Sequence, residues 1–197
     1  MILGYKRSLS NLYATKLNNN GYLLFKDFFN SYEASKIKCF SNNLDYFKED
    51  KLKATNNQYQ LIENFIKNDD NIKNLLEEKI NPLINNICKE KMILSEDKIY
   101  IKKPYGAEIN FINQNCKWNL SNKKYVNICL FGNIFTKKNG GYLEIDNRNK
   151  KENINIIETT PKDLLIFNSY IPYKFKNNRN NYNQKIFHFT FTPFSIS

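Results

Sequence analysis

The sequence predicts a mainly β protein in which a jelly-roll barrel is buttressed by N-terminal helices. Helical periodicity is confined to about residues 1–95, whereas short apolar or alternating segments follow one another over about 98–192. Helices followed by about eight strands are typical of a jelly roll with a helical support. A chain of 197 residues with 41% hydrophobic content can bury one core, so we expect a single domain over residues 1–197.

The N-terminal part contains predicted helices and one early strand. A helical stretch is expected around Ser8 to Leu17, and the apolar segment Gly21 to Phe25 has the character of a strand. The sequence Asn30-Ser-Tyr-Glu33 is typical of a capping box, in which the Asn accepts a backbone N–H and the Glu reaches back to the cap. It predicts a helix that runs through about Phe40.

Two further helical blocks are expected before the barrel. One spans about residues 59–67, and the other covers about residues 71–89, where apolar side chains recur at three-to-four spacing. Pro82 lies inside this second pattern. It predicts a kink or a division there, because proline removes a hydrogen bond from a helix interior.

The barrel part divides into short segments with strand character. Turn-rich stretches separate them, including the Asn139-Gly140-Gly141 turn and the asparagine-rich stretch 177–183. The expected strands are 98–102, 107–112, 125–131, 141–145, 154–158, 163–167, 173–175 and 185–192.

The formal net charge of +11 does not by itself identify a binding partner for the protein. The excess is largely Lys scattered among Asn, in tracts such as 147–151 and 176–181. Because abundant Lys, Asn and Ile also reflect an AT-rich genome, we interpret the charge as a solvated surface. Nucleic acid or an acidic glycan stays open as an alternative partner, and such binding would fall steeply with salt.

The sequence indicates a cytoplasmic protein. No stretch approaches the roughly 18 to 20 consecutive apolar residues that a membrane span needs, and the N-terminus lacks the order of a secretory signal. The cysteines are widely spaced and form no C-x-x-C pair, which disfavours a zinc site. We expect free, mostly buried thiols at Cys39, Cys88, Cys116 and Cys129.

Several local motifs of the chain occur in a characteristic order. They are the Gly21-Tyr22 strand before the Glu33 cap, the Asn139-Gly140 turn, the strand Asp163 to Ser169, and the pair Pro172-Tyr173. In this order they resemble the phytanoyl-CoA dioxygenase-like branch of the Fe(II)/2-oxoglutarate-dependent oxygenases. A prolyl-hydroxylase-like relative fits the Gly140-Gly141 turn equally well. The resemblance spans about residues 21–192 and implies a double-stranded β-helix, the cupin-like barrel of that superfamily.

The resemblance also places the family's iron ligands, and all three positions carry other residues. Where the family has His-x-Asp and a distal His, this sequence has Gln114, Cys116 and Tyr173. A catalytic Fe(II) site of this kind needs two imidazoles and a carboxylate, and the chain has one histidine, His188. We therefore predict no standard metal site. Fe(II) and 2-oxoglutarate are expected as cofactors only if an atypical site exists.

Lys185 and Trp118 complete the pocket that the resemblance implies. Lys185 stands where the family binds 2-oxoglutarate with an Arg, which implies an anion site there, and a surface lysine is the alternative. Trp118 would form the pocket wall beside Cys116. Strand alternation places Lys185 and His188 on opposite faces, so an inward Lys185 implies an outward, structural His188.

These observations favour a degenerate oxygenase-like protein that acts as a binding or interaction scaffold. Its expected ligand is a small anionic molecule near Lys185 or a protein partner of the basic exterior. Two alternatives stay open. One is a divergent oxygenase or metal-independent enzyme that uses the same barrel. The other is a basic jelly-roll module that binds nucleic acid or acidic glycan.

Overall fold

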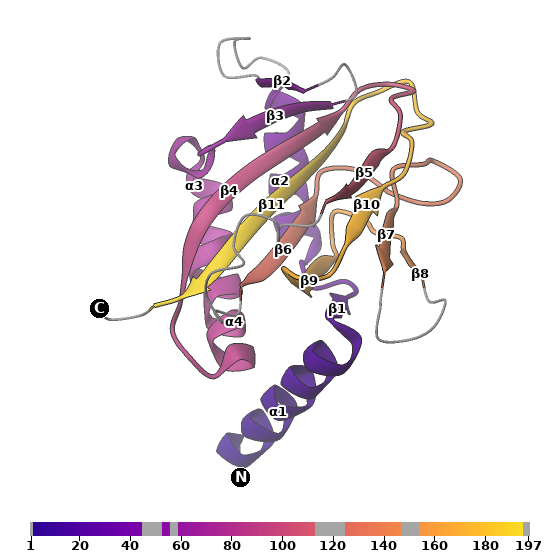
Figure 1. Ribbon diagram of the computed structural model, residues 1–197. Helices are drawn as coiled ribbons and strands as arrows, with labels where there is room; N and C mark the ends of the chain where they lie inside the picture. Colours follow the sequence, from indigo (N-terminus) through magenta and orange to yellow (C-terminus); the bar gives the residue numbers. More distant parts are fainter. Residues whose placement is uncertain (1, 45–52, 56–58, 113–124, 147–153, 195–197) are drawn as a thin grey trace.

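Helices dominate the first part of the chain in the computed structural model, which describes residues 2–44, 53–55, 59–112, 125–146 and 154–194 (Figure 1). A 3-10 turn, η3, and a π-helical turn, η4, lie among the α-helices. The helical elements are α1 (Ile2–Asn20), α2 (Ser31–Asn43), η3 (Ile66–Asn68), α3 (Asp70–Leu75), η4 (Leu76–Ile80) and α4 (Asn81–Cys88). None of these described helices combines the length and the apolarity needed to cross a membrane.

Every barrel segment predicted from the sequence contains a strand. These strands are β4 (Met92–Lys102), β5 (Ile109–Ile112), β6 (Val126–Phe131), β7 (Leu143–Asp146), β8 (Ile154–Ile157), β9 (Leu164–Asn168), β10 (Tyr173–Phe175) and β11 (Gln184–Pro193). Three strands come from the N-terminal part: β1 (Tyr22–Phe25), which was expected, and β2 (Lys53–Thr55) and β3 (Tyr59–Glu63), which were not.

The strands form two antiparallel sheets that pack face to face. The larger sheet has seven strands in the order β1-β9-β6-β11-β4-β3-β2, and the smaller has four in the order β5-β10-β7-β8. Strands far apart in the sequence are neighbours, such as β1 with β9 and β5 with β10. The jelly roll therefore closes only when the two halves of the chain meet, and the predicted mainly β barrel with N-terminal helices is confirmed (Figure 1).

Two hydrophobic cores lie on the two faces of the larger sheet. β11 shows this division clearly, because its side chains alternate between the faces. Phe187, Phe189 and Phe191 pack in the core that the helices share, together with residues such as Ile37 of α2. Ile186 packs in the core between the two sheets. The helices therefore cover the outer face of the larger sheet, and the barrel interior lies on its other face.

Local signals predicted the start of α2 and a division near Pro82, whereas α1 is longer than the predicted stretch Ser8 to Leu17. The Asn30 side chain accepts a hydrogen bond from the Glu33 backbone N–H at 2.9 Å, and the Glu33 carboxylate accepts one from the Asn30 N–H at 2.8 Å, so the capping box is confirmed. Pro82 lies in the first turn of α4, so the long helical pattern is divided as predicted. The helical block predicted over 59–67 is wrong. Most of it forms β3, because pairing with β4 satisfies its backbone groups.

The described cysteines are free but differ in exposure. Cys129 is buried, Cys88 is half-buried and Cys39 is exposed. The expectation of mostly buried thiols is therefore wrong for Cys39, which lies on the solvent side of α2. Cys116 lies outside the described residues.

Candidate functional site

The barrel interior brings Tyr173 and His188 together. Tyr173 comes from β10 in the smaller sheet and His188 from β11 in the larger sheet, and both side chains are fully buried. The Tyr173 hydroxyl lies 3.3 Å from His188 Nε2. The two rings are nearly parallel, with an interplanar angle of 17°. A side-chain hydrogen bond therefore joins the two sheets across the barrel.

Tyr100 and Cys129 extend this pair into a small polar cluster. Tyr100 of β4 shares a hydrogen bond with Tyr173, and Cys129 of β6 is the direct cross-strand neighbour of His188. Aromatic rings surround the cluster, and Phe167 packs edge-on against Tyr173 with ring centroids 4.8 Å apart. The interior cluster is defined here as Tyr100, Cys129, Tyr173 and His188.

Burial keeps the interior cluster uncharged. Desolvation, together with a smaller effect of the Lys98 charge, lowers the pKa of His188 to about 3. Desolvation likewise raises the pKa of Tyr173 far above its usual value, and those of Tyr100 and Cys129 are also raised. A surrounding of low dielectric disfavours each charged form. At neutral pH these groups are poorly matched to general acid–base catalysis, which works best with a pKa near the operating pH.

Two buried polar atoms near the cluster have no hydrogen-bond partner among the described residues. They are Nδ1 of His188 and Nδ2 of Asn127. The other amide atom of Asn127, Oδ1, accepts a hydrogen bond from the Thr190 hydroxyl at 3.0 Å. Because buried polar atoms are almost always paired in proteins, these atoms mark positions suited to a water molecule or a polar ligand group.

Lys185 and Tyr173 are not brought together. The two faces of β11 are opposite to the expected ones, since His188 faces the barrel interior and Lys185 faces the helices. Lys185 is buried and its ammonium donates a hydrogen bond to the carbonyl oxygen of Ser41, in the last turn of α2, at 2.6 Å. A cation at the carbonyl end of a helix is favourable because it meets the negative end of the helix dipole.

The described residues do not fit an iron centre of the oxygenase type. Gln114, Cys116 and Trp118 lie outside the described part of the chain. Within the described ranges, no group of three or more His, Cys, Asp or Glu side chains is placed to hold a metal ion. The interior cluster offers one imidazole, two neutral phenols and a neutral thiol, whereas such a centre needs two imidazoles and a carboxylate.

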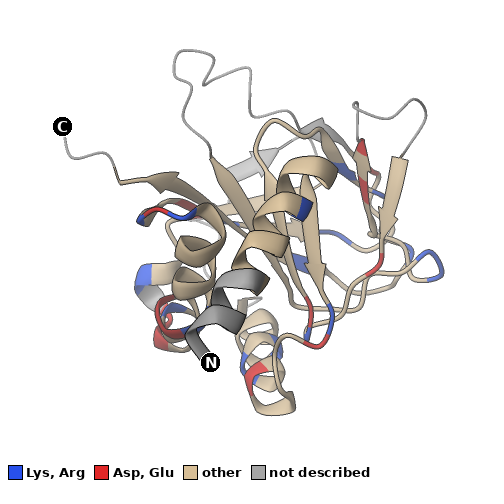
Figure 2. Cartoon of the chain, turned by 90° about the horizontal axis from the view of Figure 1, so that it is seen from below, with Lys and Arg blue, Asp and Glu red and all other residues tan. Residues whose placement is uncertain are grey.

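Ionised side chains gather instead on the outer face of the smaller sheet. Lys176 Nζ lies 2.7 Å from Glu108 Oε2, and Lys174 Nζ lies 3.2 Å from Glu144 Oε2. The outer charge cluster is defined here as Glu108, Glu144, Lys174 and Lys176. The alternation Tyr173-Lys174-Phe175-Lys176 is a sequence signal for the two lysines, because it places them on the face opposite the buried aromatic side chains. Elsewhere, basic and acidic positions are interspersed over several elements (Figure 2).

The arrangement of the two sheets and the helices defines the class of fold. Two facing antiparallel sheets, with helices against the outer face of the larger one, form a double-stranded β-helix of the type found in 2-oxoglutarate oxygenases. No family model matches the sequence. No curated protein matches it either.

Solved structures match this fold over nearly the whole chain. A prolyl-4-hydroxylase of Pseudomonas putida has a TM-score of 0.72 at 12% identity, covering 94% of this chain and 98% of that one. EctD from S. alaskensis, solved with 2-oxoglutarate and 5-hydroxyectoine, has a TM-score of 0.75 at 11% identity over 91% and 74%. The non-heme alpha ketoglutarate dependent carbocyclase SnoK from nogalamycin biosynthesis has a TM-score of 0.76 at 8% identity over 92% and 83%. At such identities the likeness is one of fold.

Proposed function

We propose that this chain is a degenerate oxygenase-like barrel that acts by binding and carries no standard metal site. The position of its one histidine is the main support. His188 lies in the barrel interior, fully buried, uncharged at neutral pH and hydrogen-bonded to Tyr173. A single chain with one imidazole lacks the two that an Fe(II) centre of this type uses.

The packing of Tyr173 supports the same proposal. By the resemblance, this residue stands where the family has its distal iron-binding His. Its side chain is fully buried and packs on Phe167, and its hydroxyl forms a hydrogen bond with the His188 imidazole. Burial raises its pKa, so the phenolate that a metal ion would need is disfavoured. Gln114, at the first ligand position, is a neutral amide and would donate weakly to Fe(II).

The ligand of such a scaffold stays within the predicted classes, a small anionic molecule or a protein partner. The resemblance assigns the anion to Lys185. In the folded chain this ammonium faces α2 and is bonded to the Ser41 carbonyl, which gives a ligand in the barrel interior little access to it. We therefore look for the anionic ligand at cationic positions outside the barrel interior.

A divergent enzyme is the second candidate, and the interior cluster is the observation in its favour. Hydrogen-bonded phenols, an imidazole and a thiol inside a barrel are chemically versatile groups. Their shifted pKa values, however, leave them uncharged at neutral pH. If this candidate holds, C116A or Y173F abolishes activity while the fold is retained. Unchanged activity in both variants would exclude it.

Thermal-shift titration of the purified full chain tests the proposal. Mn(II), Fe(II) and 2-oxoglutarate are added singly and together, and the metal content of the protein is analysed in parallel. A ligand that binds the folded state raises Tm by mass action. We expect no shift and no stoichiometric metal. A cooperative rise of Tm with metal plus 2-oxoglutarate would overturn the proposal and establish an atypical oxygenase site.

A further inference from the structure

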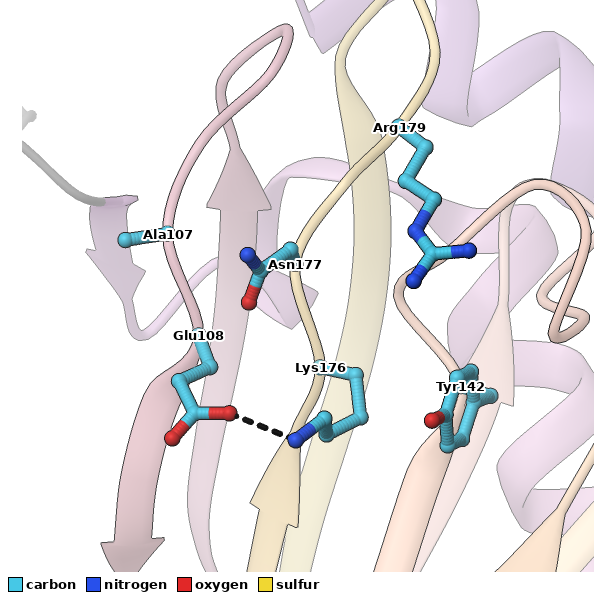
Figure 3. Close-up of a pocket in the computed structure, with 6 residues that line it drawn as sticks. All are labelled: Ala107, Glu108, Tyr142, Lys176, Asn177 and Arg179. Atoms are coloured by element: carbon cyan, nitrogen blue, oxygen red, sulfur yellow. Dashed lines mark hydrogen bonds and ion pairs between the residues drawn. The ribbon is translucent and has the colours of Figure 1, made fainter.

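A pocket of about 360 Å³ lies on the outside of the barrel, separate from the interior cluster. It is formed where the segment before β5, the segment before β7 and the loop after β10 come together (Figure 3). The residues that line it are Ala107, Glu108, Tyr142, Lys176, Asn177 and Arg179. A ligand site in this pocket rests on the binding role proposed above, which places the anionic ligand outside the barrel interior, but its test by phosphate binding is separate from the titration with metal and 2-oxoglutarate.

Backbone hydrogen bonds hold the wall of this pocket in place. Gly141 N–H donates to the Asn177 carbonyl at 2.7 Å, Arg179 N–H donates to the Asn139 carbonyl at 3.1 Å, and Lys176 N–H donates to the Tyr142 carbonyl at 2.9 Å. These bonds join the turn before β7 to the loop after β10. The pocket wall is therefore fixed by backbone contacts rather than by mobile side chains alone.

Gly140 and Asn178 allow these segments to approach closely. Gly140 has a φ of +74°, and a Cβ atom there would lie 2.1 Å from the Asn177 carbonyl oxygen, so only glycine fits. Asn178 is buried, and its amide group donates to the carbonyls of Lys102, Lys103 and Tyr182. The pocket is thus preorganised, which reduces the ordering cost of binding.

The charges around the pocket are predominantly positive. Lys176 is paired with Glu108 at 2.7 Å, whereas Arg179 has no carboxylate partner among the described residues. Within the described part of the chain, the Arg179 guanidinium makes one hydrogen bond, to the Lys137 carbonyl at 3.3 Å. In Figure 3 it is directed toward Tyr142 across the open space of the pocket.

A third cation lies behind the pocket floor. Lys102 is fully buried, and its ammonium donates to the carbonyls of Ala107 at 3.1 Å, Phe175 at 3.3 Å and Lys176 at 2.6 Å. Two of these carbonyls belong to residues that line the pocket. Burial lowers the pKa of Lys102 to about 8, so the group stays largely protonated at neutral pH. Lys102, Lys174 and Lys176 act on the Glu108 carboxylate, and Lys176 also lies 3.8 Å from Glu144. With Arg179, four cations therefore face two carboxylates at this side of the barrel.

We propose that this pocket binds the phosphate group of a small phosphate monoester. The Arg179 guanidinium and the Tyr142 hydroxyl border the space, and the Lys176 ammonium, turned toward Glu108 in Figure 3, lies on its other side. A guanidinium, a hydroxyl and an ammonium together suit the three terminal oxygens of a phosphate better than the two of a carboxylate. The excess of cations favours a dianion over a monoanion. The ring of Tyr142 offers a flat surface beside the phosphate for the rest of the ligand.

The test is a titration of the full chain with phenyl phosphate, inorganic phosphate and benzoate at low salt, followed by amide NMR spectra. We expect both phosphates to bind, with shifts concentrated at residues 106–108, 142 and 176–180. Binding should weaken as salt is added, because screening reduces the attraction between charges. Benzoate that binds as tightly as phenyl phosphate would overturn the assignment to a phosphate, and shifts centred elsewhere would overturn the site.

R179Q provides the decisive variant. It removes the guanidinium but only one exposed hydrogen bond of the fold, and we expect it to weaken phenyl phosphate binding by about tenfold or more, since hydrogen bonds to charged groups are strong. Y142F removes one hydroxyl and should weaken binding by a smaller factor. The matched control is K38Q, which removes an exposed cation of α2 and should leave binding unchanged. Equal affinities of R179Q, K38Q and the natural chain would refute the proposal.

Discussion

The interior cluster and the outer pocket have opposite effects on the charge of their ionisable side chains. In the interior, His188 is desolvated and no carboxylate of the described residues pairs with it, and its pKa falls to about 3. In the pocket, the hydrogen bond between Glu108 and Lys176 lowers the pKa of the carboxyl and raises that of the amine. One region neutralises its groups and the other keeps them charged. Recognition of a charged ligand therefore belongs to the outer region, whereas the interior provides hydrogen bonds that join the sheets.

Lys102 shows which property decides between the two outcomes. It is as buried as His188, with both side chains at 0% exposure, yet it stays largely protonated at neutral pH. An ammonium has three N–H donors, and three backbone carbonyls accept from Lys102. Among the described residues, the His188 imidazole has one hydrogen-bond partner, the neutral hydroxyl of Tyr173. Burial lowers both pKa values, but the ordinary pKa of 10.5 for Lys102 falls only to about 8, with the charge of Glu108 opposing the fall, whereas the ordinary 6.5 of His188 falls to about 3.

The largest effect is expected from protonation of His188. Its ordinary pKa of 6.5 applies to the unfolded chain, and the folded pKa is about 3. Between these values only the unfolded state binds the proton, so the free energy of unfolding falls as the pH falls through this window. The fall attributable to this group is about 4 kcal/mol at pH 3. Urea unfolding of the natural chain and of H188Q, at a series of pH values, isolates it from the carboxylates.

The stability difference between these two chains should be constant above pH 6.5 and should shift in favour of H188Q below it. Gln is close in size to His and keeps a hydrogen-bonding group near the Tyr173 hydroxyl, and it does not titrate. A difference that stays the same from pH 7 to pH 3 would mean that the imidazole is accessible to protons in the folded state.

Removal of the Lys102 ammonium should give the second largest effect. K102M keeps much of the aliphatic volume but leaves three carbonyl groups without their donor. We expect a loss of about 3 kcal/mol in the free energy of unfolding, because unsatisfied buried acceptors are costly. The matched control is K103M at the neighbouring exposed position, which should change stability by less than about 0.5 kcal/mol. Equal urea midpoints for the two variants would contradict this account.

Y173F should have a smaller effect on stability. The variant removes the hydroxyl that bonds to His188 Nε2 and leaves the aromatic packing on Phe167 in place. We expect a loss of about 1 to 2 kcal/mol, the usual cost of leaving a buried polar partner unpaired. Y182F, at an exposed tyrosine, is the control and should be neutral in the same denaturation series. A neutral Y173F would show that the hydroxyl does not join the sheets.

The barrel strands were predictable because their signals are local. Alternation and turn residues mark each of them, and the Asn30 and Glu33 side chains mark the start of α2. β3 was missed because its conformation depends on pairing with β4, far away in the sequence. No pattern within residues 59–67 distinguishes a strand from a short helix when the partner strand is unknown.

The site residues were harder to predict for the same reason. Alternation correctly separated His188 from Lys185, but only the position of the helices decides which face of β11 becomes the barrel interior. The tract 176–181 was interpreted as solvated surface. Asn178 within it is buried and bonded to the distant Lys102 and Lys103 carbonyls. These contacts shape the pocket around Arg179. They join residues far apart in the sequence, so the spacing of residues does not predict them.

The smallest effect is expected from a change in the outer charge cluster. It tests whether these charges stabilise the fold or set the charge of the ligand pocket. E144Q removes one carboxylate of the outer charge cluster, 3.2 Å from Lys174 and 3.8 Å from Lys176. We expect a loss of about 1 kcal/mol in unfolding free energy at low salt, and only slightly less at high salt, because Glu144 is buried and its lysine partners are partly exposed. Phenyl phosphate should bind E144Q slightly more tightly, because the variant makes the surroundings of Lys176 more positive. A large loss of stability together with weaker phosphate binding would show that the cluster holds the smaller sheet together and does not set the charge of the pocket.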